Sequence, residues 1–83
     1  LVRVELFGYA ARMAEERRWH PTQELRRMDV AGEHVELRFH LSRPEELFRW
    51  VLGWGSKARV LEPRSLIDRV SMELARMREA DDA

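Results

Sequence analysis

The chain has 83 residues, of which 45% are hydrophobic and 36% are charged, and it contains no cysteine. This length suits one small domain, and the lack of cysteine excludes disulfide bonds, Cys-based zinc sites, iron–sulfur clusters and thiol nucleophiles. The 15 basic and 15 acidic residues cancel, which argues against a dedicated nucleic-acid module, because such modules usually carry a basic excess. No apolar run is long enough to span a membrane, and we expect a cytoplasmic domain.

The first part of the chain predicts a strand followed by a helix. Residues 1–7 alternate apolar and polar side chains with the period of a half-buried strand, and Gly8 ends this run. Residues 9–18 are rich in helix-forming side chains and predict a short helix with a small apolar face. Pro21 ends that helix, because the residue before a proline avoids helical backbone angles.

Two strands joined by a turn are predicted next. Residues 24–29 alternate poorly, which indicates a sheet edge or a bulge. Gly32 supplies the turn, because glycine accepts a positive φ. Residues 34–41 form the clearest strand of the sequence. Its core-facing side chains are Val35, Leu37, Phe39 and Leu41. Its opposite set, which faces water or a polar partner, is His34, Glu36, Arg38 and His40.

A second helix follows this strand. Ser42 with Glu45 three residues later has the pattern of a capping box, in which two side chains satisfy the free N–H groups of the first turn. The helix carries an apolar sector wider than one packed face requires. Gly53 and Gly55 are expected to end it.

The remaining segments complete a single α+β domain over residues 1–83. Residues 58–61 predict a short strand, residues 64–79 predict a long amphipathic helix, and residues 81–83 predict a frayed end. The order β-α-β-β-α-β-α is a ferredoxin-like βαββαβ pattern with an extra C-terminal helix. We expect a four-stranded antiparallel sheet with helices on one face and the other face left to solvent or a neighbour.

Catalytic and metal chemistry find little support in the sequence. His34 and His40 lie on one face of one predicted strand but about 20 Å apart, so they cannot share an ion. His20 has no second ligand at a metal-binding spacing. Adjacent carboxylates on a helix do not face one site, and no phosphate loop or nucleophile motif is present. We therefore expect no enzyme activity, no cofactor and no metal.

Nucleic-acid binding stays open in a weaker form. Ferredoxin-like sheets that bind single strands stack bases on aromatic side chains of their central strands, whereas Phe39 is expected to point into the core. Phosphate contacts by basic side chains remain an alternative to simple salt bridges with neighbouring glutamates. The candidates for these contacts are Arg17, Arg18, Arg26, Arg27, Arg38 and His40.

Three tryptophans indicate a surface for a protein partner. Trp19, Trp50 and Trp54 are large rings in a domain too small to bury all of them, and tryptophan is a favoured anchor of protein interfaces. The alternative is that Trp50 and Trp54 cover the sheet and that Trp19 packs under a helix.

Several segments, taken in order, resemble one family over nearly the whole chain. They are WHPTQ at residues 19–23, the hairpin with Gly32, VELRF at 35–39, PEEL at 44–47, WVLGWG at 50–55 and VLEP at 60–63. Together they resemble the C-terminal extension (WCX) domain of bacterial WYL-domain transcription regulators. That family often ends its last helix with an aromatic residue, whereas this chain ends in ADDA at 80–83, so its final turn is expected to differ.

The resemblance implies a parent protein and partners. The parent would bind promoter DNA through a separate N-terminal domain and would sense a ligand through a WYL domain. The present chain, which begins at Leu1, would be a fragment of that regulator. It would help to form a homodimer and to couple the WYL domain, in the same chain or in its dimer mate, to DNA affinity. The alternative is direct contact with a single-stranded nucleic-acid effector together with the WYL domain.

Within this hypothesis, two segments are the expected partner contacts. In the loop 19–23, Trp19 offers an anchor, and His20 and Gln23 offer hydrogen-bond donors and acceptors to the ligand-sensing domain. The helix that carries Trp50 and Trp54 is the second candidate surface. The resemblance implies no catalytic residue.

Overall fold

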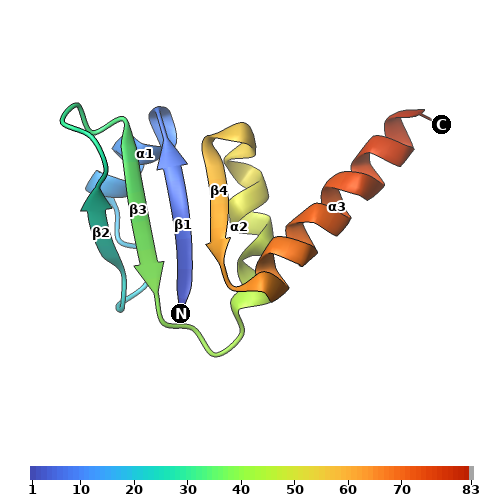
Figure 1. Ribbon diagram of the computed structural model, residues 1–83, viewed down its shortest axis with the longest axis horizontal. Coiled ribbons are helices and arrows are strands. Elements are labelled where there is room, and N and C mark those ends of the chain that lie inside the picture. The colour runs from blue at the N-terminus through green and yellow to red at the C-terminus, as the bar shows by residue number, and fades with distance from the viewer. Residues whose placement is uncertain (83) are drawn as a thin grey trace.

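The computed structural model describes residues 1–82 and contains a four-stranded antiparallel sheet with the strand order β2-β3-β1-β4 (Figure 1). The strands are β1 (Val2–Phe7), β2 (Glu24–Arg27), β3 (His34–Phe39) and β4 (Ala58–Glu62). The α-helices are α1 (Tyr9–Glu16), α2 (Phe48–Gly53) and α3 (Arg64–Asp82), and 3₁₀ turns η1 (Pro44–Leu47) and η2 (Gly55–Lys57) flank α2. The predicted α+β class, the antiparallel sheet and the extra C-terminal helix are confirmed.

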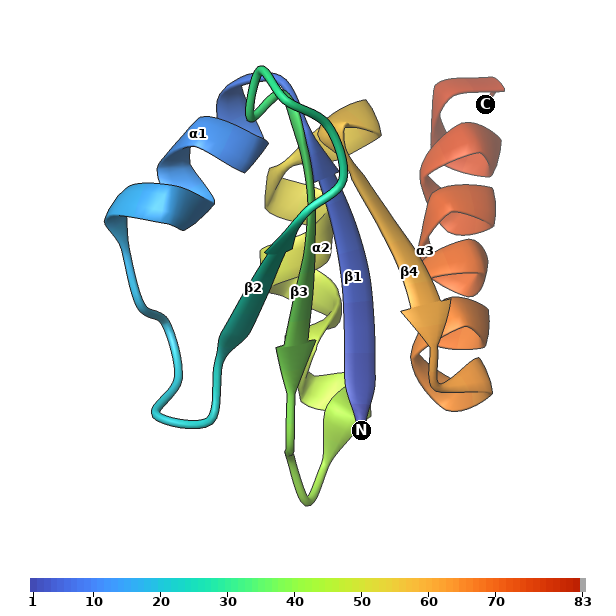
Figure 2. The same cartoon turned by 60° about the vertical axis from the view of Figure 1, so that its left-hand side comes forward.

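The strands of the two β-α-β units interleave. Strand β3 lies between β1 and β2, and β1 lies between β3 and β4, so each unit encloses a strand of the other in the split β-α-β manner. Helices α1 and α2 lie behind the sheet in the view of Figure 1, and Figure 2 shows them from the side. The opposite face of the sheet is the one formed by the polar side chains of β1 and β3. This face is called the polar sheet face below.

The core lies between the sheet and these helices. Alternate residues of β1 and β3 face this core, as the period-2 patterns predict, and Glu36 of β3 is also buried, but on the opposite face of the sheet. Three alanines of α1 let that helix approach the sheet closely, and Leu66 inserts from the first turn of α3. The buried core residues are Val2, Val4, Leu6, Ala10, Ala11, Ala14, Val35, Leu37, Phe39 and Leu66.

The capping box predicted at Ser42 is wrong. The residue at the N-cap position is Arg43, no side-chain cap hydrogen bond is formed, and the segment begins with the 3₁₀ turn η1 before α2 starts at Phe48. A hydroxyl caps a helix only from the N-cap residue itself, and Ser42 lies one residue too early. Proline stands in the first turn of η1 as expected.

Other element ends differ by a few residues from the predictions. Helix α1 stops at Glu16, and β3 stops at Phe39. Strand β2 is an edge strand, which confirms one of the two predicted explanations, while the register shift lies between β1 and β4. The β2 strand is short because Asp29 accepts backbone hydrogen bonds from Glu33 and His34 (3.0 and 3.3 Å) and tightens the turn.

The C-terminal helix is longer than predicted. Helix α3 continues through Asp82, so residues 81 and 82 are helical and not a frayed end, whereas residue 83 lies outside the described residues. Over residues 1–82, none of the helices combines the length and the apolar composition that crossing a bilayer requires.

Candidate interaction surfaces

The loop that joins α1 to β2 is organised by Gln23, whose side chain is buried. Its Oε1 accepts a hydrogen bond from the Trp19 backbone N–H (2.8 Å), and its Nε2 donates to the carbonyl of Arg17 (3.0 Å). The guanidinium of Arg18 donates to the carbonyls of Pro21 and Gln23 (both 3.2 Å). These bonds end α1 and fix the loop from the inside, so the amide of Gln23 is used within the loop. Its predicted role as a partner contact stays a prediction.

The other polar group predicted in this loop lies nearer to solvent. His20 is half-buried, and its Nδ1 lies 2.7 Å from the hydroxyl of Thr22. The backbone N–H of His40 donates to the same hydroxyl (2.9 Å), which ties the loop to the end of β3. His20 and His40 therefore come near one another through Thr22, which the sequence did not indicate because the two residues are far apart along the chain.

The three predicted tryptophans form one aromatic cluster. Trp19 packs edge-on against Trp50 and Trp54, with ring centroids 5.3 and 5.9 Å apart. Trp50 also meets Phe39 of the core at 5.8 Å in an edge-to-face arrangement, which is a favourable geometry for aromatic pairs. The cluster thus joins the loop, α2 and β3, and all three tryptophans stay half-buried. Whether one of them also anchors a partner stays a prediction.

The indole nitrogens of Trp50 and Trp54 are buried, and neither has a hydrogen-bond partner among the described residues. Their rings meet nearly perpendicular to one another, at 86°, so ring edges face neighbouring π faces, which are weak acceptors. Beside this cluster lies a hollow of about 270 Å³. It is lined by Arg17, Trp19, Arg49, Trp50, Gly53 and Trp54.

An ion network occupies the polar sheet face. Glu36 accepts hydrogen bonds from Arg3 on β1 (3.0 Å) and from Arg38 on its own strand (2.7 Å), and Arg3 also donates to Glu62 (2.8 Å). Glu36 is only 4% exposed, although it faces away from α1 and α2, because the arginine side chains lie over it. The predicted polar character of this face is confirmed.

The electrostatics of this network keep its carboxylate ionised. The hydrogen bond from Arg38, followed by that from Arg3, lowers the pKa of Glu36, although burial acts in the opposite direction. The carboxylates of Glu62 and Glu36 raise the pKa of the Arg3 guanidinium. A carboxylate of this kind is a poor proton donor near neutral pH, which suits a structural ion pair.

The remaining histidine lies on the same face. His34 stacks on Phe7 with ring centroids 4.4 Å apart, and its Nε2 contacts the carboxylate of Glu5. Within residues 1–82, His, Cys, Asp and Glu side chains nowhere gather in the threes that could hold a metal ion.

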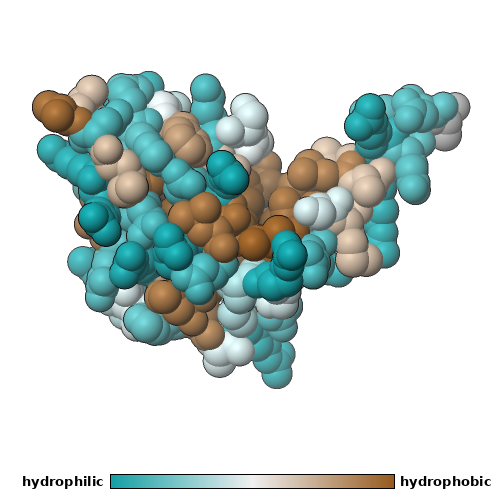
Figure 3. Space-filling view, viewed as in Figure 1, coloured by the Kyte–Doolittle hydropathy of each residue, from teal (hydrophilic) through white to brown (hydrophobic). Residues whose placement is uncertain are grey.

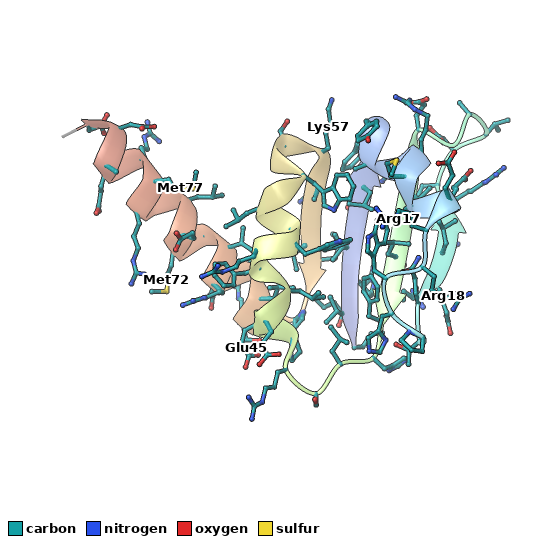
Figure 4. The ribbon with its side chains drawn as sticks, turned by 180° about the vertical axis from the view of Figure 1, so that it is seen from behind. Arg17, Arg18, Glu45, Lys57, Met72 and Met77 are labelled. Atoms are coloured by element: carbon teal, nitrogen blue, oxygen red, sulfur yellow. The ribbon has the colours of Figure 1, made fainter. Side chains whose placement is uncertain are left out.

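The arginines proposed for phosphate contacts fall into two groups. Arg17, Arg18 and Arg27 line a hollow of about 430 Å³ between α1 and β2, and Figure 4 shows Arg17 and Arg18 at that end of the molecule. Arg26 and Arg38 line a smaller hollow of about 140 Å³. Neighbours along β2 point to opposite faces, which separates the two groups.

An apolar hollow between α2 and α3 was not identified from the sequence. It has a volume of about 300 Å³ and is lined by Val51, Leu52, Gly55, Ser56, Ala58, Val70, Leu74 and Met77. A second hollow of about 440 Å³ lies between β4 and the start of α3. Figure 3 shows hydrophobic atoms gathered where the body of the domain meets α3. The apolar stripe of α3 was visible in the sequence, but its extension beyond the sheet was not.

A split β-α-β sheet has helices on one face, an ion network on the other and an apolar hollow beside a long terminal helix, and these features define a small α+β domain. The WCX domain family matches residues 1–78, and the chain belongs to that family, as the sequence resemblance predicted. WCX is a domain of WYL-type regulators, and the family is associated with regulation and is not a known catalytic one. A comparison with curated proteins finds no match.

Proposed function

We propose that this chain is a non-catalytic dimerisation and signal-coupling domain of a ligand-responsive, DNA-binding transcription regulator. Family membership supports the regulatory setting. In this proposal the domain acts in the cytoplasm, contacts the WYL domain of its own chain or of its dimer mate, and leaves promoter DNA to a separate N-terminal domain. A ligand on the neighbouring domain changes DNA affinity only if it favours one dimer arrangement over another.

The observation that carries the proposal is the apolar surface along α3. Leu74 and Met77 are 51% and 53% exposed, and they line the hollow against α2 together with Val51. Contiguous exposed apolar surface of this kind marks interaction sites in soluble domains. The non-catalytic part of the proposal is supported by the family, which is associated with regulation and is not a known catalytic one.

Sedimentation equilibrium of the 83-residue chain tests the proposal. We expect the weight-average mass to rise from that of a monomer towards that of a dimer as the protein concentration increases. A strict monomer at every concentration would contradict dimerisation. A turnover assay is not informative without a substrate, so the association measurement carries the test.

A second candidate function is contact with a single-stranded nucleic acid. The observation in its favour is the group of three arginines around the hollow between α1 and β2, in which Arg17 makes no side-chain hydrogen bond or ion pair within residues 1–82. Binding of a fluorescent oligonucleotide at decreasing salt tests this candidate. Phosphate contacts strengthen as salt falls, so a chain that does not bind at the lowest salt lacks this function.

A further inference from the structure

Helix α3 starts in the core and then leaves it. Leu66 is fully buried, Ile67 and Val70 are half-buried, and from residue 71 to residue 82 every residue except Glu73 is exposed. Figure 1 shows the helix extending away from the sheet and from α2. Most helical stability in proteins comes from packing of an amphipathic face. The outer half of α3 gains little of this packing within its own domain, and a packing partner would add it.

The side of α3 that lacks a partner can be identified. Leu66, Val70, Leu74 and Met77 follow one another at intervals of four, four and three residues, which places them on one stripe of the helix. The first two pack on the core, and the last two continue the stripe along the open hollow. The side chain of Met72 points to a different side of the helix from that of Met77, as Figure 4 shows.

The charges beside this stripe favour a second copy of the same helix. Glu73 and Arg76 are three residues apart and flank the stripe on the same side. In two antiparallel helices related by a two-fold axis near Leu74, residues of the same flank face each other, so that Glu73 of each copy lies opposite Arg76 of the other. Within residues 1–82, neither side chain forms an ion pair.

The ends of α3 add to this complementarity. The first turn holds no acidic residue and the last turn holds no basic residue, although acidic groups at the start and basic groups at the end would stabilise the helix dipole. The helix begins with Arg64 and ends with Asp81 and Asp82. With Glu73 of one copy opposite Arg76 of the other, Asp82 lies level with Ile67, so the acidic end of each helix comes within about one turn of Arg64 at the start of the other.

We infer that two copies of this chain associate through α3, antiparallel about a two-fold axis near Leu74, with Leu74 and Met77 of each copy filling the hollow beside α2 of the other. This inference rests on the proposed dimerisation and assigns it to one surface. It also gives the interface a register, because the reciprocal contact between Glu73 and Arg76 fixes how far the two helices overlap.

Two substitutions to glutamate test the surface. Leu74→Glu places a charge on the stripe, and Met72→Glu places the same charge on a different side of the same helix at nearly equal exposure, 51% against 53%. Sedimentation equilibrium is expected to show a dimer dissociation constant raised about tenfold or more by Leu74→Glu and nearly unchanged by Met72→Glu. Circular dichroism checks that both variants keep their helix content.

A charge exchange tests the register. Glu73→Arg and Arg76→Glu each place like charges opposite one another and are each expected to weaken the dimer about two- to fivefold. The double variant restores opposite charges and is expected to recover most of the wild-type association. A dimer that Leu74→Glu leaves intact, or a double variant no tighter than the single ones, overturns this inference and leaves dimerisation standing. A wild-type chain that stays monomeric overturns both.

Discussion

Arg3 and Glu36 are diagonal neighbours on the polar sheet face, with Nη2 of the arginine 3.0 Å from Oε1 of the glutamate. In the ladder between β1 and β3, Arg3 is directly opposite Arg38, and Glu5 is directly opposite Glu36. Two arginines directly opposite each other repel. Glu36 contacts both of them and removes this repulsion, which explains why a carboxylate is held among partly covered guanidinium groups.

The stability of the domain is expected to depend on the ionisation of Glu36. Its lowered pKa means that its contribution is fully present above the ordinary glutamate pKa of about 4.3 and is lost as the pH falls through the lower folded-state pKa. Glu36→Gln is therefore expected to reduce the free energy of unfolding by about 1–2 kcal/mol at neutral pH. Urea unfolding at several pH values measures this difference.

The matched control for Glu36→Gln is Glu24→Gln. Glu24 lies on the edge strand β2 and is exposed, so its change is expected to have little effect. The difference between wild type and Glu36→Gln should shrink below about pH 4. A difference that stays constant from neutral to acid pH would show that the carboxylate charge is not what stabilises the network.

Trp54→Ala is expected to lower stability, because the ring packs against Trp19 and Trp50 and lies beside the core. Truncation of a large, partly buried ring removes about 2–4 kcal/mol of stability. Tyr9→Ala is the control. The ring centroids of Tyr9 and Trp54 are 6.3 Å apart, but Tyr9 is itself 59% exposed. Denaturant unfolding together with sedimentation separates the two roles: a loss of association without a loss of stability would identify Trp54 as an interface anchor and not a core residue.

Two neighbouring glycines are expected to respond in opposite directions to alanine. Gly55 has a φ of +59°, whereas Gly53 ends α2 without a positive φ and has open space where a Cβ would lie. Gly55→Ala is expected to reduce the free energy of unfolding by about 1 kcal/mol through backbone strain. Gly53→Ala is expected to raise it by about 0.5–1 kcal/mol, because alanine is the better helix former. Thermal unfolding of both variants checks the signs, and equal effects would contradict the backbone argument.

If the chain binds single-stranded nucleic acid, Arg17 is expected to contribute to the salt dependence. Each phosphate contact on a single strand adds about 0.7 to the slope of log affinity against log salt. Arg17→Ala should lower the slope by about that amount. Arg12→Ala is the control, because both oxygens of Glu33 already hold that guanidinium at 2.7 and 2.8 Å. Equal slopes for the two variants would place the phosphate contacts elsewhere.

The sequence predicted those parts of the fold that depend on neighbouring residues, such as the alternation of a strand and the glycine of a turn. The alternation in residues 34–41 identified the side chains of β3 that enter the core, and the glycine at position 32, with a φ of +73°, supplies the turn between β2 and β3 as expected. The capping box failed for a local reason as well, since a shift of one residue removes the hydroxyl of Ser42 from the position where it can cap.

The surfaces could be predicted only in part. The sequence identified the three tryptophans, but their mutual contacts depend on a loop that Gln23 closes through bonds to residues four and six positions away. Likewise, the apolar stripe of α3 shows which side of the helix needs cover, but the angle at which the helix leaves the sheet decides how much of that side the domain covers itself. Packing between elements that are distant in the sequence sets such angles. The hydrophobic periodicity of a single helix does not specify them.

The anchoring of α3 has a mechanical consequence. Within the described residues of the helix, Leu66 alone is fully buried, so the start of the helix is fixed in the core while its outer half extends beyond it. A rise of 1.5 Å per residue separates Leu66 from Asp82 by about 24 Å. A tilt of about 10° about Leu66 would therefore move the far end of α3 by about 4 Å. In the proposed dimer, a small repacking around Leu66 would shift the second copy that packs against this helix.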